Sequence, residues 1–125
     1  MQLKKIDNIM YRVKDLDVSA EFYSSLGLKQ VWRDDEHQMI GFIFPESDSE
    51  IVIHSNETIP SPDFSFLVDN VEEFVREFKT KGYKVCKEPF DVRTGKFAVL
   101  SDPDGNMINI IDLTKFGGKP KYDGI

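Results

Sequence analysis

Few side chains in this sequence are of the types that perform acid–base or nucleophilic chemistry near neutral pH. There are two histidines, His37 and His54, and one cysteine, Cys86. His54 ends the apolar run from Ile51 to Ile53, and its ordinary pKa of about 6.5 suits either proton transfer or a structural hydrogen bond at a strand end. His37 directly follows three acidic residues in a turn segment, so we expect it to be solvated.

Cys86 and the glycine-containing segments give no support for nucleophilic or phosphate chemistry. No histidine lies near Cys86, so we interpret this residue as a small, buried or half-buried apolar side chain. A single cysteine excludes an intramolecular disulfide and a cysteine-based zinc cage. No Gly-x-Ser-x-Gly elbow is present, and the segment Gly117-Gly118-Lys119 follows the last expected strand instead of opening a helix, as a phosphate cradle would.

Chain length and charge narrow the classes of partner. The 125 residues suit one domain, residues 1–125. The net charge of −6 has the wrong sign for binding phosphate backbones or anionic lipids. No apolar run approaches the roughly 20 residues that span a bilayer, and no signal-peptide hydrophobic region opens the chain. We therefore expect no nucleic-acid partner, no membrane association and a cytoplasmic location.

A shift of 55 residues lays the first half of the chain onto the second. The matched pairs are Ile9 with Phe64, Tyr11 with Phe66, Val13 with Val68, Asp15 with Asn70, Leu16 with Val71, Tyr23 with Phe78 and Gly27 with Gly82. This self-similarity indicates two modules of one design, about residues 3–56 and 61–113. The tail consists of residues 114–125, and from Phe116 on, where three glycines and Pro120 occur, we expect it to be frayed or draped over a neighbour.

The first module is predicted to open with a strand over residues 9–13 and to continue into a helix of about nine residues. We take Asp17 as the N-cap of this helix. Its apolar stripe is predicted at Val18, Phe22 and Leu26, which are spaced by four residues. Gly27 follows as the residue that ends the helix.

The second module repeats the plan with a strand over residues 64–68 and a better-marked helix. Asn70 followed by Glu73 resembles a capping box. Gly82 ends the helix. The apolar face of this helix is predicted to consist of Val71, Phe74, Val75 and Phe78.

Three strands are predicted after each helix, which makes two βαβββ modules. Their expected ranges are 30–33, 39–44 and 51–54 in the first module, and 84–87, 97–100 and 107–111 in the second. One helix covers only one face of a four-stranded sheet, so the other face must meet something else. We therefore expect an α+β fold in which the modules form a curved mixed eight-stranded sheet, with helices outside and a concave cup as the default ligand site.

Two motifs carry a resemblance to a known superfamily. The opening segments Ile6-Asp7-Asn8-Ile9, Val13-Lys14-Asp15-Leu16, Phe22-Tyr23 and Leu26-Gly27-Leu28, and the closing segment Asp102-Pro103-Asp104-Gly105-Asn106, are similar to those of the vicinal oxygen chelate superfamily. That superfamily holds glyoxalase I, extradiol dioxygenases and bleomycin resistance proteins. The likeness covers residues 3–113 and is specific for the fold, whereas members of the superfamily perform unrelated chemistry on one scaffold.

The resemblance implies four metal-ligand positions in the cup, usually histidine on the opening strands and glutamate on the closing strands. At these positions this sequence has Asn8, Val52, Asp63 and Asn109. Two amides, one carboxylate and a valine are poor ligands for a transition metal, so we expect no metal cofactor. A register slipped by two residues would place His54 where Val52 stands. The set Asn8, His54, Asp63 and Asn109 could then hold a divalent metal weakly.

Strand alternation defines the side chains expected to contact a small-molecule ligand in the cup. These are Asn8, Arg12, Trp32, Val52, His54, Asp63, Ser65 and Asn109. Arg12 either pairs with Asp63 or binds a ligand carboxylate. Trp32 either packs in the core or forms a stacking wall. His54 and Asp63 are the candidates for acid–base catalysis.

The resemblance leaves two main functions open. The first is a metal-free small-molecule binding protein similar to the bleomycin resistance branch. The alternative is a glyoxalase-like lyase or isomerase, or a dioxygenase, acting on a small organic substrate through a weak metal site or through His54 and Asp63. A third possibility is a structural or regulatory protein with a filled cup. Related two-module chains commonly pair, so the resemblance also implies a homodimer.

Overall fold

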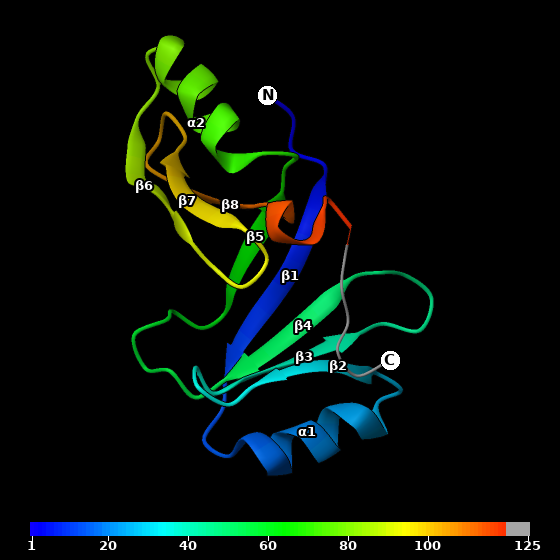
Figure 1. The fold of residues 1–125 in the computed structure, drawn as a ribbon. Helices are drawn as coiled ribbons and strands as arrows, with labels where there is room; N and C mark the ends of the chain where they lie inside the picture. Colours follow the sequence, from blue (N-terminus) through cyan, green and yellow to red (C-terminus); the bar gives the residue numbers. More distant parts are fainter. Residues whose placement is uncertain (120–125) are drawn as a thin grey trace. The chain divides into compact units, whose positions relative to one another are not determined.

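The computed structural model describes residues 1–119 and contains eight strands, two α-helices and one short 3₁₀ helix (Figure 1). In chain order the elements are β1 (Lys5–Arg12), α1 (Leu16–Ser25), β2 (Lys29–Asp34), β3 (Met39–Ile43), β4 (Glu50–His54), β5 (Asp63–Leu67), α2 (Val71–Thr80), β6 (Val85–Asp91), β7 (Lys96–Ser101), β8 (Met107–Ile111) and η1 (Thr114–Phe116). The βαβββ plan occurs twice, which confirms the predicted α+β class. The strands form one mixed, open sheet in the order β2-β3-β4-β1-β5-β8-β7-β6.

The described residues fall into two compact units. The N-terminal unit consists of residues 8–64, and the C-terminal unit consists of residues 1–7 and 65–119. Strands β1 and β5 therefore each contribute residues to both units.

In the N-terminal unit, β4 lies between β3, to which it is antiparallel, and β1, to which it is parallel. Helix α1 covers one face of this sheet (Figure 1). The core on the helix side consists of Leu28, Ile40, Phe42 and Ile53, with Leu16, Ala20 and Tyr23 packed against it. The opposite side, which we call the Trp32 face, is built from Met10, Val31, Trp32, Met39, Ile43 and Val52. A register shift between Gln30 and Trp32 explains why the neighbours Val31 and Trp32 belong to the same cluster.

The C-terminal unit repeats this architecture with α2 packed beside β6 and β7 (Figure 1). Its core consists of Val68, Val71, Val75, Ala98, Leu100 and Ile110, and Phe74 and Phe78 pack against it. The predicted N-cap is confirmed, because the Glu73 amide donates a hydrogen bond of 2.9 Å to Asn70 Oδ1. Gly82 has a φ of 81° just after the helix, a conformation that favours glycine, as predicted for the helix end.

Two predictions about α1 are wrong. The N-cap is Asp15 and not Asp17, because the Val18 amide donates to Asp15 Oδ1 at 3.0 Å. Asp17 instead accepts from Arg33 Nη1 at 2.8 Å. The stripe of Val18, Phe22 and Leu26 lies on the exposed side of the helix, with 57–66% of each residue accessible to solvent.

One further prediction fails in the C-terminal unit. Cys86 is exposed on β6 and not buried. The tail begins with η1, formed by Thr114–Phe116, and the Lys115 amide donates to the Thr94 carbonyl at 2.9 Å. Residues 120–125 of the predicted tail lie outside the described residues.

A buried carboxylate that the sequence analysis did not single out organises this end of the C-terminal unit. Asp112 is fully buried. One carboxylate oxygen accepts from the Val71 amide at 2.7 Å. The other accepts from the Lys96 amide and from the amide and hydroxyl of Thr114. Asp112 thus ties the start of α2, the start of β7 and η1 together.

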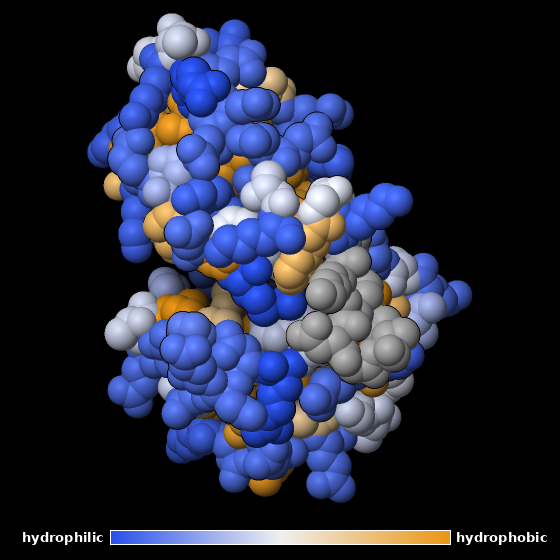
Figure 2. Space-filling model, viewed as in Figure 1, coloured by the Kyte–Doolittle hydropathy of each residue, from blue (hydrophilic) through white to orange (hydrophobic). Residues whose placement is uncertain are grey.

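The side of the molecule drawn in Figure 2 is mainly polar. Hydrophilic residues predominate on it, and apolar residues appear in small patches (Figure 2). This agrees with a mean hydropathy of −0.36 and a charged fraction of 30%. Within residues 1–119, neither helix has the length and apolar character needed to cross a bilayer.

Candidate functional site

The predicted ligand-contacting residues are distributed over both units. The N-terminal unit holds Asn8, Arg12, Trp32, Val52, His54 and Asp63, and the C-terminal unit holds Ser65 and Asn109. Most of the predicted site residues therefore belong to the N-terminal unit, where strand register places Arg12, Val52 and His54 on the Trp32 face.

Strand β4 sets the order of side chains on the Trp32 face. Val52 lies opposite Met10 of β1 and opposite Gly41 of β3. His54, two residues further along, lies opposite Arg12 and Met39. Residues directly opposite in neighbouring strands share a face, so His54 and Arg12 are neighbours at one end of an apolar surface.

Trp32 is the largest side chain on this face, and its position is fixed. Only 5% of it is exposed, and its indole Nε1 donates to Glu50 Oε1 at 2.8 Å. The ring passes so close to Gly41 that a Cβ at that position would lie 2.0 Å from Nε1. These contacts are those of the packing role, one of the two alternatives predicted for Trp32. The sequence analysis missed Gly41 and Glu50, although a glycine inside a strand is itself a signal of close approach.

His54 is the one buried imidazole among the described residues, and it has no exposed surface. Its Nδ1 accepts a hydrogen bond of 3.1 Å from the Asn56 amide, so in the neutral ring the proton is on Nε2. That Nε2 has no hydrogen-bond partner among the described residues. Leaving a buried donor unpaired costs about 1–3 kcal/mol, so an acceptor supplied by a ligand would relieve this cost.

The surroundings of His54 favour its neutral form. Burial lowers the pKa of His54, and the positive charge of Arg12 lowers it further, whereas Asp63 acts in the opposite direction. A neutral imidazole with its proton on Nε2 can donate a hydrogen bond to a substrate oxygen without carrying a charge itself.

Arg12 connects this strand end to the segment that follows β4. Its backbone amide donates to Ser61 Oγ, and its Nη1 donates to the Glu57 carbonyl, both at 3.0 Å. A guanidinium has five N–H donors in a planar fork, which suits it to bind carboxylates in addition to such a contact.

The superfamily resemblance implies a divalent metal, and the residues at its four positions do not fit one. Tyr11 pairs with Ile53 in the first module. Phe66 matches Tyr11 in the repeat, and it pairs with Ile110. Ile53 is therefore equivalent to Ile110, which makes Val52 and not His54 the equivalent of Asn109. Val52 is 3% exposed inside the Trp32 cluster and offers no ligand atom.

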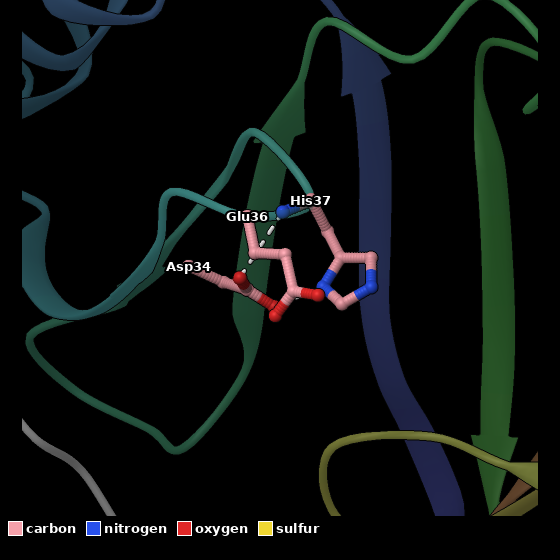
Figure 3. A group of neighbouring side chains, drawn as sticks. All are labelled: Asp34, Glu36 and His37. Carbon is pink, nitrogen blue, oxygen red and sulfur yellow. Dashed lines mark hydrogen bonds and ion pairs between the residues drawn. The ribbon is translucent and has the colours of Figure 1, made fainter.

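One group of potential metal ligands occurs elsewhere in the N-terminal unit. Within residues 1–119, Asp34, Glu36 and His37 form the one such group, with ligand atoms within 4.8 Å of one another. Asp34 ends β2, and Glu36 and His37 lie in the turn that leads to β3 (Figure 3). His37 is exposed as expected, but it is also ion-paired, with its Nδ1 2.8 Å from Asp34 Oδ2, and this carboxylate raises the pKa of His37.

Comparison with known proteins identifies relatives for most of the chain. The chain is 29% identical to a probable chloroplastic lactoylglutathione lyase of Arabidopsis thaliana, over 87% of this chain and 36% of the relative. A second lactoylglutathione lyase of the same plant is 28% identical, over 83% of this chain and 42% of the relative. The chain thus spans about two fifths of the length of these curated relatives.

Solved structures agree with the fold. The methylmalonyl-CoA epimerase of Mycobacterium tuberculosis superposes with a TM-score of 0.64 at 18% identity, covering 86% of this chain and 87% of the epimerase. Residues 5–110 match the family model described as Glyoxalase/Bleomycin resistance protein/Dioxygenase superfamily. This chain is therefore a member of the glyoxalase, bleomycin resistance protein and dioxygenase superfamily, the vicinal oxygen chelate group that its motifs resemble.

Proposed function

We propose that this chain is a lyase or isomerase that moves a proton on a small organic substrate bound at the Trp32 face, with His54 and Asp63 as its acid–base groups. The observation that supports this most directly is the buried, neutral His54, whose Nε2–H has no partner among the described residues. The names of the two plant relatives support lyase chemistry over binding alone.

The proposed step is removal of a proton from a carbon next to a carbonyl group. The half-buried Asp63 carboxylate takes the proton, and the electron pair of the C–H bond moves onto the carbonyl oxygen. The Nε2–H of His54 donates to that oxygen as its negative charge develops. Return of the proton to carbon completes the cycle, so no metal or external oxidant is needed.

The test is hydrogen exchange on lactoylglutathione, the compound named in the two plant relatives. In D₂O, the protein should replace the hydrogen on the carbon beside the thioester carbonyl with deuterium, as followed by proton NMR. Exchange should persist in excess chelator. His54→Gln should slow it about 10²-fold, within the usual range for a general acid–base group, and Asp63→Asn should slow it at least as much.

His37→Gln is the matched control, because His37 is exposed in a turn and faces only acidic neighbours. It should exchange at the rate of the unaltered chain. Exchange that requires added metal, or that survives both the His54 and the Asp63 substitutions, would contradict the proposed chemistry.

A metal-free binding protein is the second candidate, and the valine at one of the four ligand positions favours it. The chain contains one tryptophan, so its fluorescence reports on the Trp32 face alone. A saturable change in Trp32 fluorescence with small apolar ligands, together with no exchange on lactoylglutathione, would support binding without catalysis.

We also propose that the chain acts as a cytoplasmic homodimer, as the behaviour of related two-module chains suggests. Light scattering on the purified chain should then give twice the 14.4 kDa mass of one chain. A mass of 14.4 kDa at micromolar concentration would exclude a stable dimer.

A further inference from the structure

The end of the Trp32 face combines a cationic group, a neutral donor and an apolar surface within one unit. Arg12, His54 and Met39 lie side by side across β1, β4 and β3. The next row on the same face contains Met10, Val52 and Gly41, with Trp32 lying against the glycine. A ligand on this surface would meet apolar side chains along its length and two polar groups at one end.

Both polar groups at that end are hydrogen-bond donors. His54 presents Nε2–H because its Nδ1 already accepts from the Asn56 amide. Among residues 1–119, the Arg12 guanidinium donates one hydrogen bond, from Nη1 to the Glu57 carbonyl. A group that could satisfy both donors at once must offer lone pairs, and a negative charge on it would be balanced by Arg12.

We propose that Arg12 and the Nε2–H of His54 together bind an anionic oxygen of the ligand, a carboxylate or an enolate, while Met10, Met39 and Trp32 contact its apolar part. The inference deepens the proposed function and rests on it for the choice of this face. It names the substrate class as a molecule with an apolar part next to a group that carries, or develops, an oxyanion.

Binding at this position requires a local rearrangement, because no part of His54 is exposed. Residues 55–62 follow His54 directly, and Arg12 holds them at the Ser61 hydroxyl and at the Glu57 carbonyl. An anion can engage the guanidinium donors that the Glu57 carbonyl does not use.

The test compares two probes of the same shape and different charge, phenylacetate and phenylacetamide. Each is titrated into the full chain at neutral pH while Trp32 fluorescence and the nitrogen–proton correlation of His54 Nε2 are recorded. Phenylacetate should bind saturably and at least about tenfold more tightly than phenylacetamide, because its hydrogen bonds are charge-assisted. The Nε2 proton signal should move downfield with phenylacetate.

Three variants test whether Arg12 and His54 cause the preference for phenylacetate. Arg12→Gln should weaken phenylacetate binding about tenfold and leave phenylacetamide binding unchanged. His54→Phe keeps an aromatic ring but removes the donor, and it should weaken phenylacetate binding by a similar factor. Arg33→Gln is the matched control, because Arg33 pairs with Asp17 and Asp35 and should affect neither probe.

Equal affinity for the two probes, no saturable binding of either, or unchanged phenylacetate binding in Arg12→Gln would overturn the inference. The proposed function is measured separately, by exchange on lactoylglutathione. If exchange is absent while phenylacetate binds in the expected pattern, the enzymatic proposal fails and the assignment of ligand class stands. If exchange occurs and the two probes bind equally, the assignment of ligand class fails and the enzymatic proposal stands.

Discussion

Gly41 shows how a residue without a side chain can determine the shape of a candidate ligand surface. A methyl group there would come within 2.0 Å of Trp32 Nε1, so the indole would have to leave its place and its bond to Glu50. Gly41→Ala should lower the free energy of unfolding by about 1–3 kcal/mol and shift Trp32 fluorescence, because the face becomes overpacked. Urea unfolding measures the first effect. An unshifted spectrum with native stability would show that the ring does not need this glycine.

Asp112 is the buried hydrogen-bond acceptor on which the C-terminal unit depends most. Its two oxygens accept four hydrogen bonds, and an asparagine would direct an NH₂ group at one set of donors. Asp112→Asn should therefore cost about 1–3 kcal/mol of unfolding free energy and speed hydrogen exchange of the Val71 amide. Asp69→Asn, at a carboxylate that is 86% exposed, should cost far less. Equal losses would refute this assignment.

Helix α1 shows that an apolar stripe does not by itself reveal which side of a helix packs. Phe22 is 57% exposed, whereas its neighbour Tyr23 packs against the core beside Phe42. Phe22→Ala should change the unfolding free energy by less than about 1 kcal/mol, and Tyr23→Ala should cost about 2–4 kcal/mol. Chemical denaturation of both variants checks the ranking, and the reverse order would restore the predicted stripe as the buried side.

The internal repeat proved a better guide to the elements than local signals. It pairs Asp15 with Asn70, and both are helix N-caps, whereas the local pattern favoured Asp17. Two acids in one turn satisfy the same capping preference, and only the distant Arg33 distinguishes them. Alternation along the strands placed Arg12 and His54 on one face. Glu50, Gly41 and Asp112 escaped notice because their roles depend on contacts between elements, which spacing along one element does not reveal.

At the scale of the whole molecule, the two copies of one design have diverged in their buried polar groups. The strand pairing that makes Ile53 equivalent to Ile110 also makes Ser55 equivalent to Asp112. The Ser55 amide donates to the Gln38 carbonyl in the turn before β3, and the Asp112 amide donates to the Lys96 carbonyl at the start of β7. Ser55 adds a hydroxyl contact to Gln38, whereas Asp112 gathers four donors. The first module instead buries His54, which has a donor left over. The second copy thus has the more complete polar network, and the first copy has the candidate site.

This difference gives the whole molecule a pH dependence that can be assigned to one residue. The pKa of His54 is lower in the folded chain than the roughly 6.5 of an unfolded histidine, so below pH 6.5 the unfolded state binds more protons. The contribution of His54 to the free energy of unfolding should be fully present above pH 6.5. It should fall as the pH is lowered toward the pKa of His54 in the folded chain. His37, whose pKa is raised by Asp34, acts in the opposite direction, but it is exposed and its effect is screened.

Urea midpoints between about pH 5 and 7.5 should therefore decrease on acidification in the unaltered chain and in His37→Gln. In His54→Gln this decrease should be smaller, because the variant has no imidazole to protonate at that site. If His54→Gln retained the full decrease, the acid sensitivity would come from carboxylates. The proposed chemistry rests on a buried, neutral His54, and the urea measurements would then contradict that state of the side chain.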